Sequence, residues 1–391
     1  MRPDDPAPVT PGPLRIVERS TLNPAEPGTA RATATFPTFA VLADGSLLAS
    51  YGVGTTKDSD DATIELRRSH DGGTTWGPPW APFASTVDGR RGSLKYGPIT
   101  VLDGDQLIIA VLWIDREAFP GRPLFNAETE GCLPMSILLA DSFDAGETWT
   151  PWRTVPMPDD VGPPSLTNGI VQFPSGRLLI SVETNKTYLD PSPWFQRVVH
   201  AWSEDGGSSW STPATVVADP AGRIANWDQR GAVAPDGRLV SFAWVYDFER
   251  VAYLQIRRRI SGDEGHSFGP PTELGITDQP SHPAILPDGR VVIAWVDRFG
   301  TRSIRARTAA SPDAPFPSET EVVLYEAPPL VAESGIASDS TGDALADMQA
   351  WSYGLAYAEA LPGGDVGVVH YAPGPDGGIE IRWVRLRLDE R

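Results

Sequence analysis

The sequence of 391 residues is poor in several features that would point to common protein classes. Cys132 is its single cysteine, so no disulfide can form within the chain. No run of 18 apolar residues is present to span a membrane, and the opening MRPDDPAPVTPGPL lacks the basic and apolar regions of a secretory signal peptide. These absences predict a cytoplasmic protein, with secretion left open if a signal peptide has been trimmed ahead of Met1.

Basic charge is also scarce. The 32 Lys and Arg residues stand against 51 Asp and Glu residues, which gives a formal net charge of −19. A chain this acidic repels phosphate backbones and anionic lipids, so we expect neither nucleic acid nor a membrane as a partner. The oligomeric state stays open.

The sequence contains none of the common cofactor motifs. It has no Cys/His cluster with zinc spacing, no Gly-rich phosphate loop and no Gly-x-Ser-x-Gly segment. We therefore expect no metal and no cofactor.

Glycine and proline, by contrast, are frequent, with 38 and 39 residues scattered between short runs of Val, Ile and Leu. This punctuation is typical of many short strands joined by turns. A tight turn between two apolar strands recurs six times, at Ala43–Gly45, Leu102–Gly104, Pro174–Gly176, Pro235–Gly237, Pro287–Gly289 and Pro362–Gly364.

A second motif, Ser-x-Asp-x-Gly-x-Thr/Ser-Trp/Phe, recurs in step with these turns. In this motif the Asp accepts backbone N–H bonds, the Gly supplies a positive φ, and the aromatic residue fills the space between neighbouring sheets. Its copies are Ser69–Trp76, Ser142–Trp149, Ser203–Trp210 and Ser261–Phe268, with an eroded fifth at Ser311–Asp313.

Six similar units predict an all-β fold, a six-bladed β-propeller with four antiparallel strands in each blade. We expect one domain over residues 1–391, with residues 1–13 as a flexible N-terminal segment. Leu14–Val17 is expected to pair with Ile379–Leu386 and so close the ring. Two β-sandwich domains are the alternative, although sandwiches do not require two turn motifs in phase.

The chain resembles the bacterial sialidases, or neuraminidases. The resemblance rests on Phe36–Ser50 followed by Glu65–Trp76, which look like the opening blade of that family, and on the four Ser-x-Asp copies, which the family calls Asp-boxes or BNR repeats. With the six turns it covers nearly the whole chain. It implies a sialidase-like propeller, whereas Asp-boxes are structural and also occur in propellers with other functions.

The resemblance also implies a catalytic apparatus. Family members bind a substrate carboxylate with three arginines, and use a Tyr nucleophile, a Glu that serves it as base and an acid/base Asp. Here the first arginine is replaced within Thr35–Pro37, the second position falls near Trp244, and the third matches Arg302. The chain is therefore expected to be a divergent member that lacks most of the arginine triad.

The resemblance places the acid/base Asp in the loop Lys57–Asp61, where Asp58, Asp60 and Asp61 all qualify. Asp228 falls at the position of the family's Glu. Neither Tyr353 nor Tyr357 is in strict register with the nucleophile, and Tyr353 is the candidate.

In a propeller the ends of the inner strands face a shared axial funnel, so polar residues there are candidates for function. Two carboxylates across one cleft suit glycoside hydrolysis, and Asp228 with Asp58, Asp60 or Asp61 fits this requirement. A purely structural role, in which Asp228 caps a turn or pairs with Arg230, is the alternative.

His282 stands before Pro283 at the mouth of an inner strand and is a candidate base, or else a buried structural histidine. The expected catalytic residues are therefore Asp58, Asp60, Asp61, Asp228, Tyr353 and His282. The expected substrate-binding residues are Arg302, Arg298, Arg230, Trp227, Gln229, Asp115, Glu183 and His370.

These residues predict a sialidase-like glycoside hydrolase that acts exo-wise on a small sugar or acidic saccharide other than ordinary sialic acid. One alternative is a uronate lyase on the same fold, with His282, His370 or Tyr353 as base. The other is a propeller that binds sugar without turnover.

Overall fold

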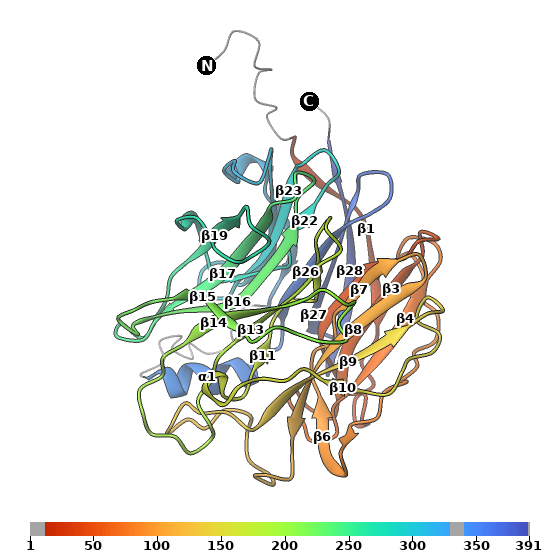
Figure 1. Ribbon diagram of the computed structural model, residues 1–391. Coiled ribbons are helices and arrows are strands. Elements are labelled where there is room, and N and C mark those ends of the chain that lie inside the picture. The colour runs from red at the N-terminus through yellow and green to blue at the C-terminus, as the bar shows by residue number, and fades with distance from the viewer. Residues whose placement is uncertain (1–11, 329–339, 390–391) are drawn as a thin grey trace.

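The computed structural model of the protein describes residues 12–328 and 340–389, which form 28 strands in five hydrogen-bonded sheets (Figure 1). The predicted flexible segment, residues 1–13, lies almost wholly outside the described residues.

The first sheet joins both ends of the chain and contains β1 (Leu14–Asn23), β2 (Thr33–Val41), β3 (Leu47–Gly54), β4 (Thr63–Ser69), β26 (Gly354–Ala360), β27 (Val366–Pro373) and β28 (Ile379–Leu388). The second contains β5 (Thr86–Val87), β6 (Arg90–Leu94), β7 (Ile99–Asp103), β8 (Gln106–Asp115), β9 (Met135–Ser142) and β10 (Arg153–Thr154). The third contains β11 (Ser165–Leu166), β12 (Val171–Gln172), β13 (Leu178–Glu183), β14 (Arg197–Ser203) and β15 (Ala214–Ala218).

The fourth sheet contains β16 (Ile224–Val233), β17 (Leu239–Asp247), β18 (Ala252–Tyr253), β19 (Gln255–Ser261) and β20 (Thr272–Thr277). The fifth contains β21 (Gln279–Pro280), β22 (Ala284–Ile285), β23 (Val291–Asp297), β24 (Ser303–Ala309) and β25 (Val322–Glu326). Besides the strands there are α1 (Thr341–Ala350) and two single turns of 3₁₀ helix, η1 (Asp159–Val161) and η2 (Ser318–Thr320).

The prediction of an all-β propeller is confirmed, whereas the number of six blades stays a prediction. One parallel bridge between Thr33 and Ile379 merges β26–β28 with β2–β4, so that two of the six expected units form one sheet. Residues from all five sheets or their connecting segments line a common cavity on the axis. Closure by the chain ends is as predicted: β1 pairs antiparallel with β28, from Leu14 with Leu388 to Asn23 with Ile381.

Both turn motifs have the predicted structure. The six tight turns each join two paired antiparallel strands. In the Ser-x-Asp turns, Asp71 Oδ1 accepts the Thr75 N–H at 2.8 Å, Ser69 Oγ accepts the Gly73 N–H at 2.8 Å, and Gly73 has a φ of +97°. The same bonds recur at Asp144, Asp205 and Asp263.

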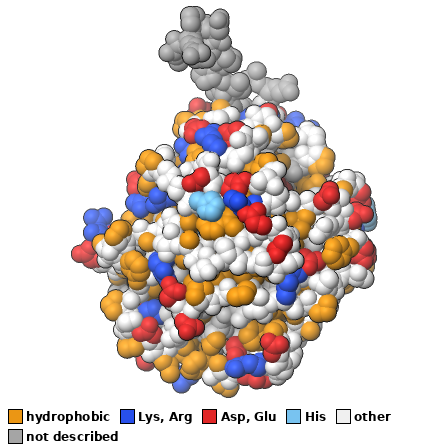
Figure 2. Space-filling model, viewed as in Figure 1, with side chains coloured by type: hydrophobic (Ala, Val, Ile, Leu, Met, Phe, Trp, Pro, Cys, Tyr) orange, Lys and Arg blue, Asp and Glu red, His pale blue; other side chains and the backbone are white. Residues whose placement is uncertain are grey.

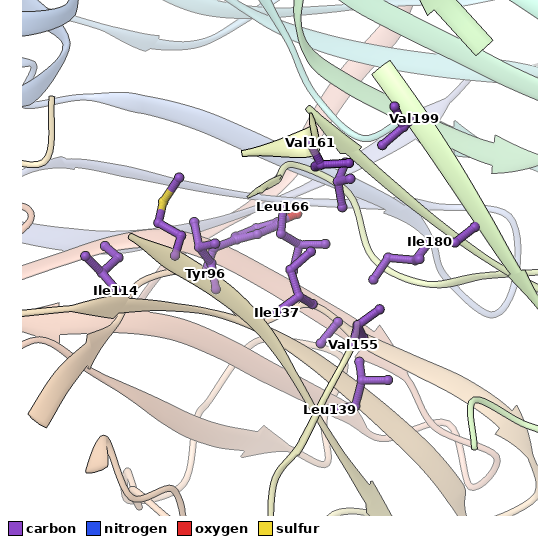
Figure 3. Packing of buried hydrophobic residues seen from close by; sticks show 14 of the residues in the cluster. Tyr96, Ile114, Ile137, Leu139, Val155, Val161, Leu166, Ile180 and Val199 are labelled. Atoms are coloured by element: carbon purple, nitrogen blue, oxygen red, sulfur yellow. The ribbon is translucent and has the colours of Figure 1, made fainter. Parts of the chain in front are cut away.

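Aliphatic side chains fill the space between neighbouring sheets. Figure 3 shows one such cluster, in which Ile137 and Leu139 of β9 lie close to Ile180 of β13 and Val199 of β14. Alternate residues of a strand point to opposite faces, so each buried strand packs on both neighbours. This packing holds the inner strand ends in fixed positions around the axis.

The surface shown in Figure 2 carries acidic and basic side chains scattered among apolar and neutral ones. Within residues 12–328 and 340–389, no helix is long and apolar enough to cross a membrane.

The Ser-x-Asp turns allow a stability test. A Cβ at Gly73 would clash with the ring of Trp383, whereas Gly206, with a φ of +69°, has open space beside it. Both alanine variants incur backbone strain, but Gly73→Ala also overpacks the inter-sheet space. We expect Gly73→Ala to lower the free energy of unfolding by about 1–3 kcal/mol more than Gly206→Ala, measured by urea denaturation at unchanged m-value. Equal losses would show that the turn-to-Trp383 packing does not contribute.

Candidate functional site

Three strands near the axis contain the same irregularity. In β2, β16 and β26 the register shifts, and one residue within each shift adopts a positive φ: Phe36 at +54°, Asp228 at +49° and Leu355 at +41°. A bulge of this kind re-aims a side chain, and all three side chains line one pocket. Asp tolerates this conformation better than Phe or Leu, and it is the one that brings a charge into the pocket.

This pocket is the predicted axial funnel, with a volume of about 150 Å³. Its lining combines charged and polar side chains with apolar side chains from the strands, from α1 and from loops. Its charged and polar residues are Lys57, Asp58, Lys95, Tyr96, Ser165, Thr167, Glu183, Asn185, Asp228, Arg230, Gln279, Arg298, Gln349 and Tyr371. Its apolar residues are Phe36, Leu112, Leu124, Phe125, Met135, Leu166, Trp194, Trp227, Trp244, Leu345, Met348, Trp351 and Leu355.

Glu183 and Asp228 form a carboxyl pair in the funnel. Glu183, at the end of β13, is buried and accepts bonds from Thr167 Oγ1 and the Gln229 N–H, both at 3.1 Å. Burial and then the charge of Asp228 raise the pKa of Glu183 to about 8. Glu183 was predicted as a binding residue, and the raised pKa of its carboxyl group is the direction that a general acid needs.

Asp228 has a cation at ion-pair distance, whereas no ion pair of Glu183 is present among the described residues. Arg230 Nη2 lies 3.7 Å from Asp228 Oδ1, and Gln279 donates a hydrogen bond to the other carboxylate oxygen. The pairing with Arg230 that the sequence left as a structural alternative is therefore present. Asp228 nevertheless lines the funnel, so the ion pair with Arg230 leaves its carboxylate accessible from the pocket.

Asp58 is the one aspartate of its loop that lines the funnel. Its buried carboxylate pairs with Lys95, and Arg116 Nη2 donates to its carbonyl oxygen at 2.8 Å. Burial would raise the pKa of Asp58, but the charges of Lys95 and Lys57 lower it further than burial raises it. Asp58 is thus the anion of a buried ion pair.

The other two aspartates of the loop lie elsewhere. Asp60 is 47% exposed in its side chain and faces Arg116 at 3.4 Å. Asp61 accepts bonds from Thr55 and Ser59 and closes the loop on itself. The prediction that left all three as candidates is thereby narrowed to Asp58.

Lys57 and Tyr371 belong to the funnel but were missing from the predicted set. Lys57 Nζ lies 3.2 Å from Tyr371 Oη, and burial lowers the pKa of Lys57 to about 7. Burial also raises the pKa of the Tyr371 hydroxyl. The sequence signal was slight, because Lys57 directly precedes Asp58 and Tyr371 lies inside the apolar strand β27.

Two cationic residues of the predicted set, Arg230 and Arg298, line the funnel. The Arg298 guanidinium stacks 3.9 Å from the centroid of the Trp351 ring and donates to Gln279 Oε1 at 3.1 Å. Within the described residues, neither Arg298 nor Lys57 forms an ion pair with a carboxylate.

Tyr353, the expected nucleophile, does not line the funnel. Its ring is 7% exposed and lies 5.5 Å from that of Tyr325, while its carbonyl oxygen accepts a bond from Arg298. Arg302 is likewise absent from the funnel lining and lies next to Tyr353. Both placements correct the expectation that these residues face the substrate.

The two candidate histidines also lie outside the funnel. His282 Nδ1 donates to the Ala358 carbonyl oxygen at 3.0 Å, and its ring stacks on Tyr357 in a separate cavity. His370 is buried near Tyr325. Burial lowers the pKa of both, to about 4 and about 3.

Of the remaining predicted residues, some stabilise neighbouring segments and some line the funnel. Asp115 Oδ1 accepts the Glu117 N–H, and the Asp115 carboxylate pairs with Arg90. Asp115 does not line the funnel. Gln229 contributes its backbone N–H to Glu183, and Trp227 lines the funnel wall. Among residues 12–328 and 340–389, no group of three or more His, Cys, Asp or Glu could hold a metal ion.

Comparison with solved structures shows which proteins share this architecture. A protein of unknown function from Dyadobacter fermentans superposes with a TM-score of 0.72 at 20% identity, covering 96% of this chain and 99% of that one. The intramolecular trans-sialidase of Ruminococcus gnavus gives 0.62 at 13% identity, covering 93% and 96%. The α-L-arabinanase of Penicillium chrysogenum gives 0.61 at 14% identity, covering 94% and 98%.

No protein-family model matches the sequence, and no curated protein matches it either. The likenesses to solved structures therefore establish the fold alone. The chain is a propeller similar to those of sialidases and of an arabinanase.

Proposed function

We propose that the protein is a glycoside hydrolase that removes a terminal acidic sugar in the axial funnel, a sugar other than ordinary sialic acid. The observation that carries the proposal is the Glu183–Asp228 pair, two carboxyl groups in one pocket with different environments. Burial and the charge of Asp228 raise the pKa of Glu183, while Arg230 lies 3.7 Å from Asp228, and two carboxyl groups in unlike environments are what acid/base glycoside hydrolysis needs.

In this mechanism Glu183 gives its proton to the glycosidic oxygen as the C–O bond breaks. Asp228 provides the negative charge that faces the anomeric carbon. Water then adds its hydroxyl group to that carbon and gives its proton to the Glu183 carboxylate, which restores the acid. Gln279 and Arg230 hold Asp228, and the Gln229 N–H with Thr167 holds Glu183, so both carboxyl groups are preorganised.

An acidic substrate follows from the balance of charge in the funnel. Four cations line it, and Lys95 and Arg230 already face Asp58 and Asp228. Lys57 already donates to Met348, Trp351 and Tyr371. Arg298 forms no ion pair with a carboxylate of the described residues and remains to meet an anionic group, and a guanidinium binds a carboxylate with directed hydrogen bonds. The stretch Thr35–Pro37, where the resemblance expects the first arginine, contains none, which argues for a sugar acid bound differently from sialic acid.

The two alternatives from the sequence receive less support. The lyase needed His282, His370 or Tyr353 as base, and none of these lines the funnel. A binding protein without turnover would not need Glu183 buried beside Asp228, because burying such a pair costs free energy. Incubation with aryl glycosides and with uronic and ulosonic acid saccharides, with product analysis, separates hydrolysis from elimination and from binding alone.

The role of Glu183 can be tested with Glu183→Gln. We expect kcat to fall by about 10²–10⁴-fold on a 4-nitrophenyl glycoside, and by much less on a 2,4-dinitrophenyl glycoside, whose leaving group needs no proton. Because the acid form is the active one, wild-type activity should be present below about pH 8 and lost above it. The pH–rate profile of the variant should lack this alkaline limb. Glu204→Gln, at a side chain that is 70% exposed, is the matched control. An equal loss of kcat on both glycosides would show that Glu183 does not donate the proton.

The coupling of the pair can be tested with Asp228→Asn. Removing the negative charge of Asp228 should lower the pKa of Glu183, so the alkaline limb of kcat/KM should move to lower pH while kcat falls. Steady-state rates from pH 5 to pH 10 measure both effects. An alkaline limb that stays in place would mean that the two carboxyl groups do not interact during catalysis.

A further inference from the structure

Helix α1 forms one wall of the funnel. Leu345, Met348 and Gln349 of α1 line the same pocket as Glu183 and Asp228. In Figure 1 the helix lies at the lower end of the strands, below β13 and β14. A helix of ten residues is marginal by itself, so its position depends on tertiary contacts.

The N-terminal part of α1 is held by packing. Ala344 and Leu345 are buried against Trp194 and Trp227. Gly342 approaches the Ala127 carbonyl so closely that a Cβ would collide with it. The first turn is therefore fitted to the protein beneath it.

The C-terminal end of α1 is held by Lys57. Its Nζ donates to the Met348 carbonyl and to the Trp351 carbonyl at 3.3 Å, and lies 3.2 Å from Tyr371 Oη. An ammonium has three donors, and this one has three acceptors. A cation at a helix C-terminus is also favoured by the exposed carbonyl groups there.

The space that α1 leaves is small. The funnel volume of about 150 Å³ equals that of an engineered cavity that accommodates benzene. This volume is matched to one six-membered ring, which favours a terminal unit over an internal unit of a polymer that is flanked on both sides.

We propose that α1 restricts the funnel to a single terminal ring, and that Lys57 is the positioning residue that sets this size limit. The inference rests on the proposed function only in taking the ring to be a sugar. It makes Lys57 a determinant of exo specificity, acting through α1.

Thiol labelling tests the size limit without any substrate. Cys132 is the single cysteine and has no exposed surface. A cysteine introduced into the funnel is therefore the thiol that the reagents modify. Ser165→Cys is nearly isosteric and lines the pocket. Its rate of modification is measured with methyl methanethiosulfonate, a small reagent, and with fluorescein-5-maleimide, a large one. We expect the large reagent to react at least 100-fold more slowly, relative to each reagent's rate with free cysteine.

Adding Lys57→Met should raise the rate with the large reagent at least 10-fold and change the rate with the small reagent less than 3-fold. Lys186→Met, which removes a lysine bonded to Ser192 on another loop, is the matched control and should change neither rate. An unchanged rate with the large reagent in folded Lys57→Met overturns the proposal. If near-ultraviolet circular dichroism shows that Lys57→Met is unfolded, Gly342→Ala displaces the other end of α1, and the same criterion applies to it.

The thiol labelling and the hydrolase assays test the size limit and the proposed function separately. Absence of turnover on every glycoside would refute the proposed function and leave the size limit standing. Equal labelling by both reagents in Ser165→Cys alone would refute the size limit and leave hydrolysis standing.

Discussion

The pairing of β1 with β28 is the constraint on which the rest of the structure depends. It ties residues from the two ends of the chain into one sheet and leaves β2 beside β28 through the Thr33–Ile379 bridge. Closure of this kind satisfies strand edges that would otherwise be exposed. It also brings the loop after β3 next to β27, so that Lys57 meets Tyr371, 314 positions away in the sequence.

Closure concentrates charge at the axis of a chain that is acidic overall. Four cations and three carboxyl groups share a funnel of about 150 Å³, where burial disfavours every charged form. The nearest charges differ from one carboxyl group to the next. Asp58 has Lys95 and Asp228 has Arg230, whereas Glu183 has no cation within ion-pair distance among the described residues and its pKa is raised by burial. The differences in environment, rather than the residue types, separate an acid from an anion.

The inner-strand bulges explain how a repeated scaffold acquires one distinct site. Phe36, Asp228 and Leu355 occupy comparable bulges with positive φ, and each directs its side chain into the funnel. Two of the three are apolar and close the cavity. The same kind of bulge thus places apolar side chains in the pocket from two strands and a carboxylate from the third.

Residue patterns alone predicted the all-β propeller, both turn motifs, closure by Leu14–Val17 and five residues that line the funnel, namely Asp58, Glu183, Asp228, Arg230 and Arg298. These depend on local turn chemistry and on a repeat that places strand ends in common register. Only the tertiary structure decided between Asp58 and its neighbours, moved Tyr353 and His282 out of the funnel and brought Lys57 and Tyr371 into it. The physical reason is that a bulge or a loop of few residues rotates a side chain from the axis into a sheet interface, and spacing along the chain does not record that rotation.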